Sequence, residues 1–334
     1  MTTILVTGGS GFLGAYAVAS ALRAGHQVRT TVRSLARELD VRAMVTAAGV
    51  DPGPALEVVP ADLTADDGWA EAMAGCTGVL HIAAPADLAE LVGPARDGAV
   101  RVLRAARDAG VARVVLTSTF GAIAYGRKAT EQPFTEADWT DPHAPGLEPY
   151  VVAKTLAERA AWDFVAREGG GLELVVINPT SVFGPVLDIN PSNSIGLVRA
   201  MLSGAMPRVP DIWITPVDVR DVADLHVRAI DLPGAGGERF IAAGDTLMSM
   251  RDVAKLLRGR LGRDAARVST RPLWTPLVRA TALAVPTMRG LAGNVGVRRR
   301  ADNTKARQAF DWTPRDAEDT LVDTARSLIA FGAV

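Results

Sequence analysis

The chain has 334 residues, of which 48% are hydrophobic, so it can bury the core of one large domain or of two unequal ones. Its formal net charge of −1 excludes the strongly basic surface that draws proteins to nucleic acid or to anionic membranes. The single cysteine, Cys76, excludes an internal disulfide, and the four histidines lack the spacing of metal ligands. We therefore expect a cytoplasmic protein that holds no metal.

The first half of the chain alternates short apolar runs with helix-like segments. This order predicts a doubly wound, Rossmann-type parallel sheet with helices on both faces. Because the first apolar run begins at Ile4, we expect no signal peptide in front of it. The expected strands lie at 4–8, 26–33, 56–63, 78–85, 112–119 and 172–179, and the expected helices lie at 15–25, 68–76, 100–110 and from 149 onward.

After Pro179 the pattern changes. Residues 180–213 are rich in Pro, Gly, Asn and Ser, the stretch at 217–230 resumes strand–helix order, and helical patterns dominate from about residue 243. We therefore expect a second, smaller and mostly helical domain. The predicted division assigns 1–178 and 214–242 to a nucleotide-binding domain, and 179–213 and 243–334 to the second domain.

Two stretches invite other interpretations. The apolar run at 275–288 carries Arg279 and Pro286, and it is too short and interrupted for a membrane span of roughly 20 apolar residues. We expect a helix pair over a core there. The basic run Arg298–Arg300 contains no aromatic residues for base stacking, so we expect a solvated helix end and no nucleic-acid site.

A strand, a glycine-rich turn and a helix open the chain. Glycine permits a tight turn and lets the backbone approach a pyrophosphate at the positive end of the following helix. Here the glycines follow a strand and open an amphipathic helix, which is the context that a dinucleotide-binding turn needs. The cofactor contacts expected in this turn are Gly8, Ser10, Gly11, Phe12, Leu13 and Gly14.

Arg33 follows the second predicted strand, 19 residues after Gly14, where a site built for NAD usually carries an acidic residue. A guanidinium can form two hydrogen bonds to a 2′-phosphate, so Arg33 favours NADP(H). The alternative interpretation is a solvated arginine at a strand end. Arg29 and Arg37 are the other candidates for the phosphate.

Two further strand ends point to the same cofactor. Asp62 and Leu63 end the third strand and are expected to contact the adenine. Ala83, Ala84 and Pro85 end the fourth strand, where small side chains let a cofactor lie close. Ligands of open α/β sheets bind at the carboxyl ends of strands, although each of these segments could also be an ordinary loop.

Tyr150 and Lys154 stand four residues apart in a segment of helix-forming residues, so their side chains lie on one helix face. A lysine ammonium favours the phenolate, so we expect Lys154 to lower the pKa of Tyr150. Tyr150 could then donate a proton to a carbonyl near neutral pH. The strand end at Ser118 and Thr119 offers a hydroxyl for the same oxygen, and we choose Thr119, although a structural hydroxyl is the alternative.

Together these motifs resemble the extended short-chain dehydrogenases/reductases, and within them the dihydroflavonol reductase, cinnamoyl-CoA reductase and microbial aldehyde/ketone reductase group. The matching segments span residues 4–226, and a weaker match follows at 302–314. The resemblance implies that Tyr150 is the proton donor and that Lys154 binds the nicotinamide ribose. It also implies that Thr119 replaces the usual serine, and that Pro179, Ser181 and Val182 line the nicotinamide pocket.

The reaction that the resemblance implies is hydride transfer from NADPH to an aldehyde or ketone, with an aromatic or bulky apolar carbonyl as the best guess. The expected partner is a small-molecule carbonyl or alcohol. The chain is expected to be either a monomer or a homodimer. An apolar pocket in the second domain could use aromatic and methionine side chains, which could equally be core. These side chains are Phe120, Trp139, Phe183, Met201 and Trp213.

Other classes on this fold stay open as alternatives. Nucleotide-sugar dehydratases carry an Asp-Glu pair where Phe120-Gly121 stands here, but an epimerase or a hydroxysteroid dehydrogenase remains possible. A non-catalytic dinucleotide sensor is the third class. Such relatives typically lack the tyrosine, so the joint presence of Thr119, Tyr150 and Lys154 argues against a sensor.

Overall fold

The structure is a computed structural model that describes residues 2–85, 92–127, 131–188, 193–276, 278 and 289–334. The chain divides into two compact units. The first comprises Met1–Ala122, Pro149–Asn178 and Val219–Phe240, and the second comprises Ile123–Glu148, Pro179–Asp218 and Ile241–Val334.

The predicted division differs from these units in three places. Residues 123–148, 214–218 and 241–242 were assigned to the nucleotide-binding domain but belong to the second unit. The segment 123–148 leaves the first unit six residues after the strand that ends at Thr117 and returns to it at Pro149. That one unit binds the cofactor and the other the substrate stays a prediction.

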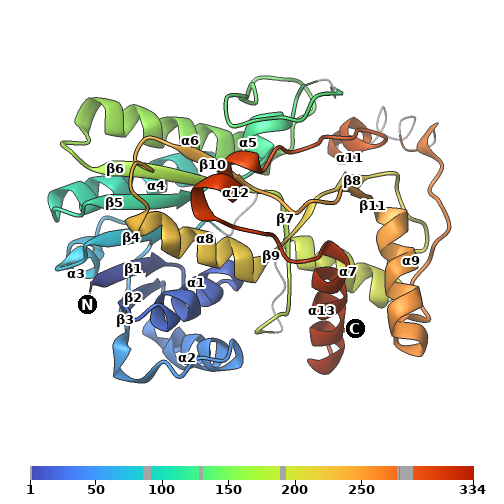
Figure 1. The fold of residues 1–334 in the computed structure, drawn as a ribbon, viewed down its shortest axis with the longest axis horizontal. Coiled ribbons are helices and arrows are strands. Elements are labelled where there is room, and N and C mark those ends of the chain that lie inside the picture. The colour runs from blue at the N-terminus through green and yellow to red at the C-terminus, as the bar shows by residue number, and fades with distance from the viewer. Residues whose placement is uncertain (1, 86–91, 128–130, 189–192, 277, 279–288) are drawn as a thin grey trace. The chain divides into compact units, whose positions relative to one another are not determined.

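A seven-stranded sheet forms the centre of the first unit, in the order β10-β6-β5-β4-β1-β2-β3 (Figure 1). The strands from β3 to β6 pair in parallel. The chain order reverses between β1 and β4, which is where ligands of such sheets bind. The Rossmann-type prediction is therefore confirmed. The strands are β1 (Thr3–Thr7), β2 (Gln27–Val32), β3 (Leu56–Pro60), β4 (Gly78–His81), β5 (Arg113–Thr117), β6 (Glu173–Pro179) and β10 (Arg239–Ala242).

Helices cover both faces of this sheet. Helices α1, α2 and α8 lie on one face, and α3, α4 and α6 lie on the other (Figure 1). Under the second group, Trp69, Leu103 and Phe164 pack on Val79 and Val176 of the strands. The helical segments are α1 (Phe12–Arg23), η1 (Leu35–Arg37), α2 (Glu38–Ala47), η2 (Gly53–Ala55), α3 (Trp69–Met73), α4 (Val92–Asp108), α6 (Pro149–Glu168) and α8 (Val219–Asp231).

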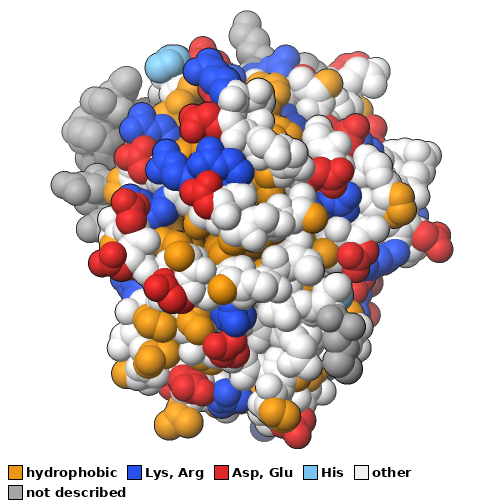
Figure 2. Space-filling model, turned by 90° about the vertical axis from the view of Figure 1, so that its left-hand side faces the viewer, with side chains coloured by type: hydrophobic (Ala, Val, Ile, Leu, Met, Phe, Trp, Pro, Cys, Tyr) orange, Lys and Arg blue, Asp and Glu red, His pale blue; other side chains and the backbone are white. Residues whose placement is uncertain are grey.

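The face of the molecule drawn in Figure 2 carries Lys and Arg side chains beside Asp and Glu side chains, in keeping with the net charge of −1. Of the apolar stretch 275–288, residues 277 and 279–288, on which the expected helix pair depends, lie outside the described residues. Among the helices that are described, none is long and apolar enough to span a membrane.

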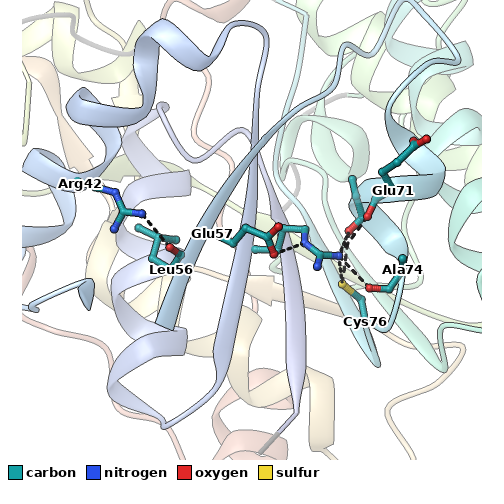
Figure 3. A network of polar contacts seen from close by, with 8 residues as sticks. Arg42, Leu56, Glu57, Glu71, Ala74 and Cys76 are labelled. Carbon is teal, nitrogen blue, oxygen red and sulfur yellow. Dashed lines mark hydrogen bonds and ion pairs between the residues drawn. The ribbon is translucent and has the colours of Figure 1, made fainter. Parts of the chain in front are cut away.

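Two strand arginines tie helix ends to the sheet in the same way. Arg29 of β2 donates from Nε to Glu57 Oε2 of β3 at 2.7 Å (Figure 3), and Arg113 of β5 donates from Nε to Glu173 Oε2 of β6 at 2.8 Å. In each case Nη1 donates to carbonyls in the last turn of a helix or just beyond it, where the helix itself supplies few partners. The accepting carbonyls are those of Glu71, Ala72 and Ala74 for Arg29, and of Ala229, Ile230 and Leu232 for Arg113.

The second unit is built around helix α13, which packs against α7, α9, β7 and β9. Two hydroxyls of α13 form hydrogen bonds at the neighbouring strands. Thr324 accepts from the Gly184 N–H at 2.7 Å, and Thr320 donates to Asp218 Oδ2 at 2.9 Å. The elements are α5 (Gly121–Ala124, at the border), β7 (Ser181–Phe183), α7 (Asn193–Leu202), β8 (Trp213–Ile214), β9 (Pro216–Asp218), β11 (Met248–Ser249), α9 (Met250–Leu261), η3 (Gly262–Ala265), α11 (Arg289–Asn294), α12 (Thr304–Phe310) and α13 (Ala317–Ala330).

Of the predicted solvated helix end at Arg298–Arg300, the helix is wrong, whereas Arg298 and Arg300 are exposed. These residues follow α11 in a segment without helical structure. The Arg298 guanidinium lies 4.0 Å from the centre of the Trp213 ring, and that of Arg299 lies 4.4 Å from the centre of the Tyr125 ring. Such stacking of arginine on aromatic rings stabilises the second unit internally.

Candidate active site

The turn between β1 and α1 has room only for glycine. A Cβ atom on Gly9 would lie 2.2 Å from Thr30 Oγ1, and one on Gly14 would lie 2.1 Å from the Gly8 carbonyl oxygen. Gly8 also has a φ of +76°, which other residues rarely adopt. Gly11 caps α1 without a side-chain hydrogen bond, and the first turn of α1 contains no acidic residue. The amide groups at the start of α1 are therefore suited to an anion.

Of the three arginines that were candidates for a 2′-phosphate, Arg33 is the one left free. Its side chain is exposed directly after β2, and within the described ranges it has no hydrogen bond or ion pair. Arg37 pairs with Asp40 at 2.6 Å. Arg29 is bonded to Glu57 and to a helix end from the middle of its strand, so it is not available for a ligand.

The loop after β3 is bonded internally. Asp62 Oδ1 accepts from the N–H and the hydroxyl of Thr64, both at 2.8 Å. These bonds hold the pKa of Asp62 below its ordinary value, and the nearby charges of Arg33 and Arg101 act in the same direction. Leu63 accepts from Arg101 through its carbonyl at 2.5 Å. The adenine contacts expected for Asp62 and Leu63 stay predictions.

Ala83, after β4, lies against the glycine turn. A Cβ atom on Gly8 would lie 3.1 Å from Ala83, and Thr7 Oγ1 accepts from the Ala83 N–H at 3.0 Å. Ala84 is exposed and Pro85 is partly exposed. The strand end is thus held close to the turn, and its contacts with a cofactor stay predictions.

Helix α6 brings Tyr150 to Thr119. The Thr119 side chain lies close enough to the phenol to influence its pKa, and Thr119 Oγ1 accepts from the Gly121 N–H at 3.1 Å. Burial raises the pKa of Tyr150, and the nearby Thr119 side chain opposes that rise. The prediction that Lys154 lowers this pKa is therefore wrong here, because desolvation of the phenol dominates and the ammonium bonds elsewhere.

Lys154 donates from Nζ to the carbonyl oxygen of Thr117 at 2.8 Å. Burial lowers the pKa of Lys154 to about 8, and the carboxylate of Glu158 acts in the opposite direction. The ammonium therefore loses its proton within the range of ordinary assays, well below the value of a free lysine.

The hydroxyls of Ser118 and Thr119 have different partners. Ser118 is buried, and its Oγ donates to Glu158 Oε2 at 2.5 Å. Thr119 carries the hydroxyl beside Tyr150. Successive side chains of an extended strand point to opposite sides, which separates the two. This geometry supports the choice of Thr119, whose role in the reaction stays a prediction.

Two buried histidines lie within electrostatic reach of Lys154. Burial lowers the pKa of His81 to about 3 and that of His226 to about 4. His226 Nδ1 donates to the Val222 carbonyl at 2.7 Å, so its Nε2 accepts from the Thr117 hydroxyl at 2.7 Å. Both rings are therefore neutral at neutral pH. Across the described part of the chain, no cluster of His, Cys, Asp or Glu could hold a metal ion.

The segment after β6 belongs to the second unit. There β7 pairs in parallel with β9, and the Ser181 N–H donates to the Thr215 carbonyl at 3.2 Å. Pro179 ends β6, and Val182 lies in β7 opposite Val217. The roles expected for Pro179, Ser181 and Val182 at a nicotinamide pocket stay predictions.

The five candidates for an apolar pocket are not equivalent. Phe183 and Met201 are each only 1% exposed, so they are core residues of the second unit. Phe120 is buried as well and belongs to the first unit. Trp139 and Trp213 remain partly exposed.

Sequence reasoning missed Asn178 and Glu158. Asn178 is fully buried at the end of β6, and its Nδ2 donates to Glu158 Oε2 at 2.9 Å and to the Thr119 carbonyl at 3.2 Å. These two acceptors fix the orientation of the amide. Its Oδ1 has no hydrogen-bond partner in the described structure. A signal for Glu158 was present, because it continues the four-residue spacing of Tyr150 and Lys154.

The residues present fit a phosphorylated dinucleotide. The glycine turn excludes side chains where a pyrophosphate would approach, and Arg33 offers an exposed guanidinium after β2. The buried Oδ1 of Asn178 has no hydrogen-bond donor in the described structure. Leaving a buried acceptor without a partner destabilises a protein by about 1–3 kcal/mol, so a donor from a ligand would be favourable at this atom.

Comparisons with known proteins agree with this geometry. The model of the NAD dependent epimerase/dehydratase family matches residues 4–243. Tetraketide alpha-pyrone reductase 2 of Arabidopsis thaliana is 35% identical over 272 residues, which cover 78% of this chain and 83% of that protein. Dihydroflavonol 4-reductase of Zea mays is 32% identical over 273 residues, which cover 77% and 74%.

The fold comparison points the same way. The yeast methylglyoxal/isovaleraldehyde reductase Gre2, solved with NADPH, superposes with a TM-score of 0.81 at 23% identity, and the match covers 100% of both chains. The chain therefore belongs to the NAD dependent epimerase/dehydratase family, that is, to the extended short-chain dehydrogenases/reductases.

Proposed function

We propose that this protein is an NADPH-dependent carbonyl reductase that converts an aldehyde or ketone into an alcohol. The observation that carries the proposal is the placement of Tyr150 beside Thr119 at the carboxyl end of β5, on the helix face that also bears Lys154, whose Nζ donates to the Thr117 carbonyl at 2.8 Å. The curated relatives named above are reductases, which supports reduction rather than epimerisation.

The bound dinucleotide supplies the hydride to the carbonyl carbon. Tyr150 gives its phenolic proton to the carbonyl oxygen, and the Thr119 hydroxyl hydrogen-bonds to the same oxygen as negative charge develops there. Because burial raises the pKa of Tyr150, the phenol stays protonated at neutral pH and is ready to donate.

Residues of the first unit would hold the pyrophosphate, the 2′-phosphate and the nicotinamide ribose of the cofactor. Amide groups at the start of α1 bind the pyrophosphate, and Arg33 binds the 2′-phosphate that distinguishes NADPH from NADH. Lys154 binds the nicotinamide ribose through its ammonium group. Further contacts come from Asp62, Leu63, Ala83, Ala84, Pro85, Pro179, Ser181 and Val182.

The substrate is an aromatic or bulky apolar carbonyl compound. The names of the relatives support this class, since they specify tetraketide alpha-pyrones, dihydroflavonols and cinnamoyl-CoA as substrates of those proteins. Partly exposed Trp139 and Trp213 offer apolar surface in the second unit.

A substrate panel tests the proposal. The purified protein is mixed with NADPH and a series of aromatic aldehydes, dihydroflavonols, cinnamoyl thioesters and small dicarbonyls, and the loss of NADPH absorbance is followed. Turnover of at least one carbonyl, with the alcohol identified as product, is expected. Tight binding of NADPH without turnover of any carbonyl in the panel, or turnover undiminished in Tyr150→Phe, would contradict it.

A further inference from the structure

A buried carboxylate behind the proposed site joins four elements of the first unit. Glu158 is 0% exposed and lies on α6, four residues after Lys154. Its Oε2 accepts from Ser118 Oγ at 2.5 Å and from Asn178 Nδ2 at 2.9 Å. Its Oε1 accepts from Arg239 Nε at 2.6 Å and from Trp162 Nε1 at 3.4 Å. One side chain thus links α6 to the ends of β5 and β6 and to the start of β10.

These bonds lead directly to the groups proposed for chemistry. Ser118 precedes Thr119 in the chain, and Asn178 donates a second hydrogen bond to the Thr119 carbonyl at 3.2 Å. Tyr150, the neighbour of Thr119, lies two helical turns before Glu158 on the same face of α6. The distance between the phenol and the threonine hydroxyl therefore depends on the carboxylate that clamps strand to helix.

We propose that Glu158 is a positioning residue, which holds the Thr119 strand end against α6 and so sets the geometry between Thr119, Tyr150 and Lys154. This inference rests on the proposed reductase function. Glu158 touches neither substrate nor cofactor, so its replacement should reduce kcat more than it weakens NADPH binding. A misplacement on the scale of 1 Å at a reacting pair can cost about a hundredfold in rate.

The charge of Glu158 is the second part of its effect. It is the negative group that opposes the loss of the Lys154 proton, while His81 on β4 and His226 on α8 face the same lysine as neutral rings. Replacing the carboxylate by an amide should therefore make Lys154 lose its proton at a lower pH. A purely structural ion pair with Arg239 would not require this change.

The kinetic test compares Glu158→Gln with Glu173→Gln. Glu173 also pairs with an arginine of the neighbouring strand, but it begins β6, at the other end of the strand from Asn178. For Glu158→Gln we expect kcat to fall about tenfold to a hundredfold with a small change in the Kd for NADPH, and for Glu173→Gln no comparable loss. Equal kcat values in wild type and folded Glu158→Gln would overturn the proposal.

The double variant Glu158→Gln/Arg239→Met separates positioning from charge neutralisation. Removing only the acid leaves a buried guanidinium without its partner, which is destabilising in itself. We expect the double variant to recover Tm relative to Glu158→Gln while its kcat stays low. Recovery of kcat together with Tm would show that Glu158 only neutralises Arg239, which overturns the proposal. If Glu158→Gln does not fold, Ser118→Ala removes one bond to the carboxylate, and an unchanged kcat there would also overturn it.

A titration without substrate keeps this test independent of the proposed function. The chain contains four lysines, so lysine enriched with carbon-13 at Cε gives few NMR signals, and Lys154→Arg identifies the relevant one. We expect the Lys154 signal to titrate at lower pH in Glu158→Gln and to be unchanged in Glu173→Gln. An unchanged titration in Glu158→Gln contradicts the role of Glu158, whereas a failure of every carbonyl to react contradicts the proposed function.

Discussion

The side chains of Tyr150 and Thr119 lie beside each other, although the first belongs to a helix and the second to a strand end 31 residues earlier in the chain. Partial burial raises the pKa of Tyr150, which keeps the phenol protonated, and the threonine hydroxyl accepts from the Gly121 amide. A carbonyl oxygen that replaces this mutual contact meets both a proton donor and a hydrogen-bond donor.

Tyr150→Phe should remove the proton donor and leave the cofactor contacts in place. We expect kcat to fall by about 10²–10⁴, the range that general acid catalysis supplies, while the Kd for NADPH changes little. Steady-state rates and NADPH fluorescence titration measure the two effects. Thr119→Ser keeps the hydroxyl and should retain most activity, whereas Thr119→Val should lose it. Comparable activity in Thr119→Val and wild type would remove Thr119 from the mechanism.

Arg33→Asp should shift the cofactor preference from NADPH toward NADH. The variant loses a charge-assisted pair with the 2′-phosphate and adds repulsion, which together correspond to about 3 kcal/mol, or roughly a hundredfold in relative kcat/KM. Arg37→Asp is the matched control, because Arg37 already pairs with Asp40. An equal shift in both variants would point to a general charge effect and not to a bond from Arg33.

The pH dependence of cofactor capture should report Lys154. Its pKa in the cofactor-free protein is about 8, below the ordinary lysine value, so the ammonium is charged below pH 8 and neutral above it. We therefore expect kcat/KM for NADPH to fall by about tenfold as the pH rises through this value, since hydrogen bonds to charged groups are stronger. Lys154→Arg keeps its charge throughout and should show no such fall; the same fall in that variant would assign it to another group.

Much of the fold and of the candidate site could be predicted from local patterns. The glycine turn, the strand ends at Arg33 and Thr119, and the helix bearing Tyr150 are each encoded within a few neighbouring residues. In a parallel sheet, the carboxyl ends of all strands meet at one edge, so topology then brings these segments together.

The features that could not be predicted depend on distant partners or on burial. Glu158 lies 40 positions from Ser118 and 81 from Arg239, so nothing near it in the chain shows that it is a buried acceptor. The direction of the Tyr150 pKa shift depends on whether desolvation, which raises the pKa, outweighs the charge of a nearby lysine, which would lower it. The sequence shows the lysine but does not show the desolvation. The stacking of Arg298 on Trp213 joins residues 85 positions apart.

Acid should destabilise the first unit through its two buried histidines. The folded-state pKa values of His81 and His226 are about 3 and about 4, below the ordinary value of 6.5, so the unfolded chain binds more protons between these limits. Stability is therefore fully present above pH 6.5 and is lost as the pH falls.

The size of this acid effect follows from the shifts. Between pH 7 and pH 5 each ring should contribute a loss of about 2 kcal/mol to the free energy of unfolding, at about 1.4 kcal/mol for each pH unit below the unfolded pKa. Urea unfolding at both pH values measures it. The variants His81→Asn and His226→Gln keep a hydrogen-bonding group but cannot be protonated, so each should remove its share of the pH dependence. His143→Gln, at an exposed position, is the control. If the double variant His81→Asn/His226→Gln loses as much stability as wild type on acidification, groups other than these two rings are responsible.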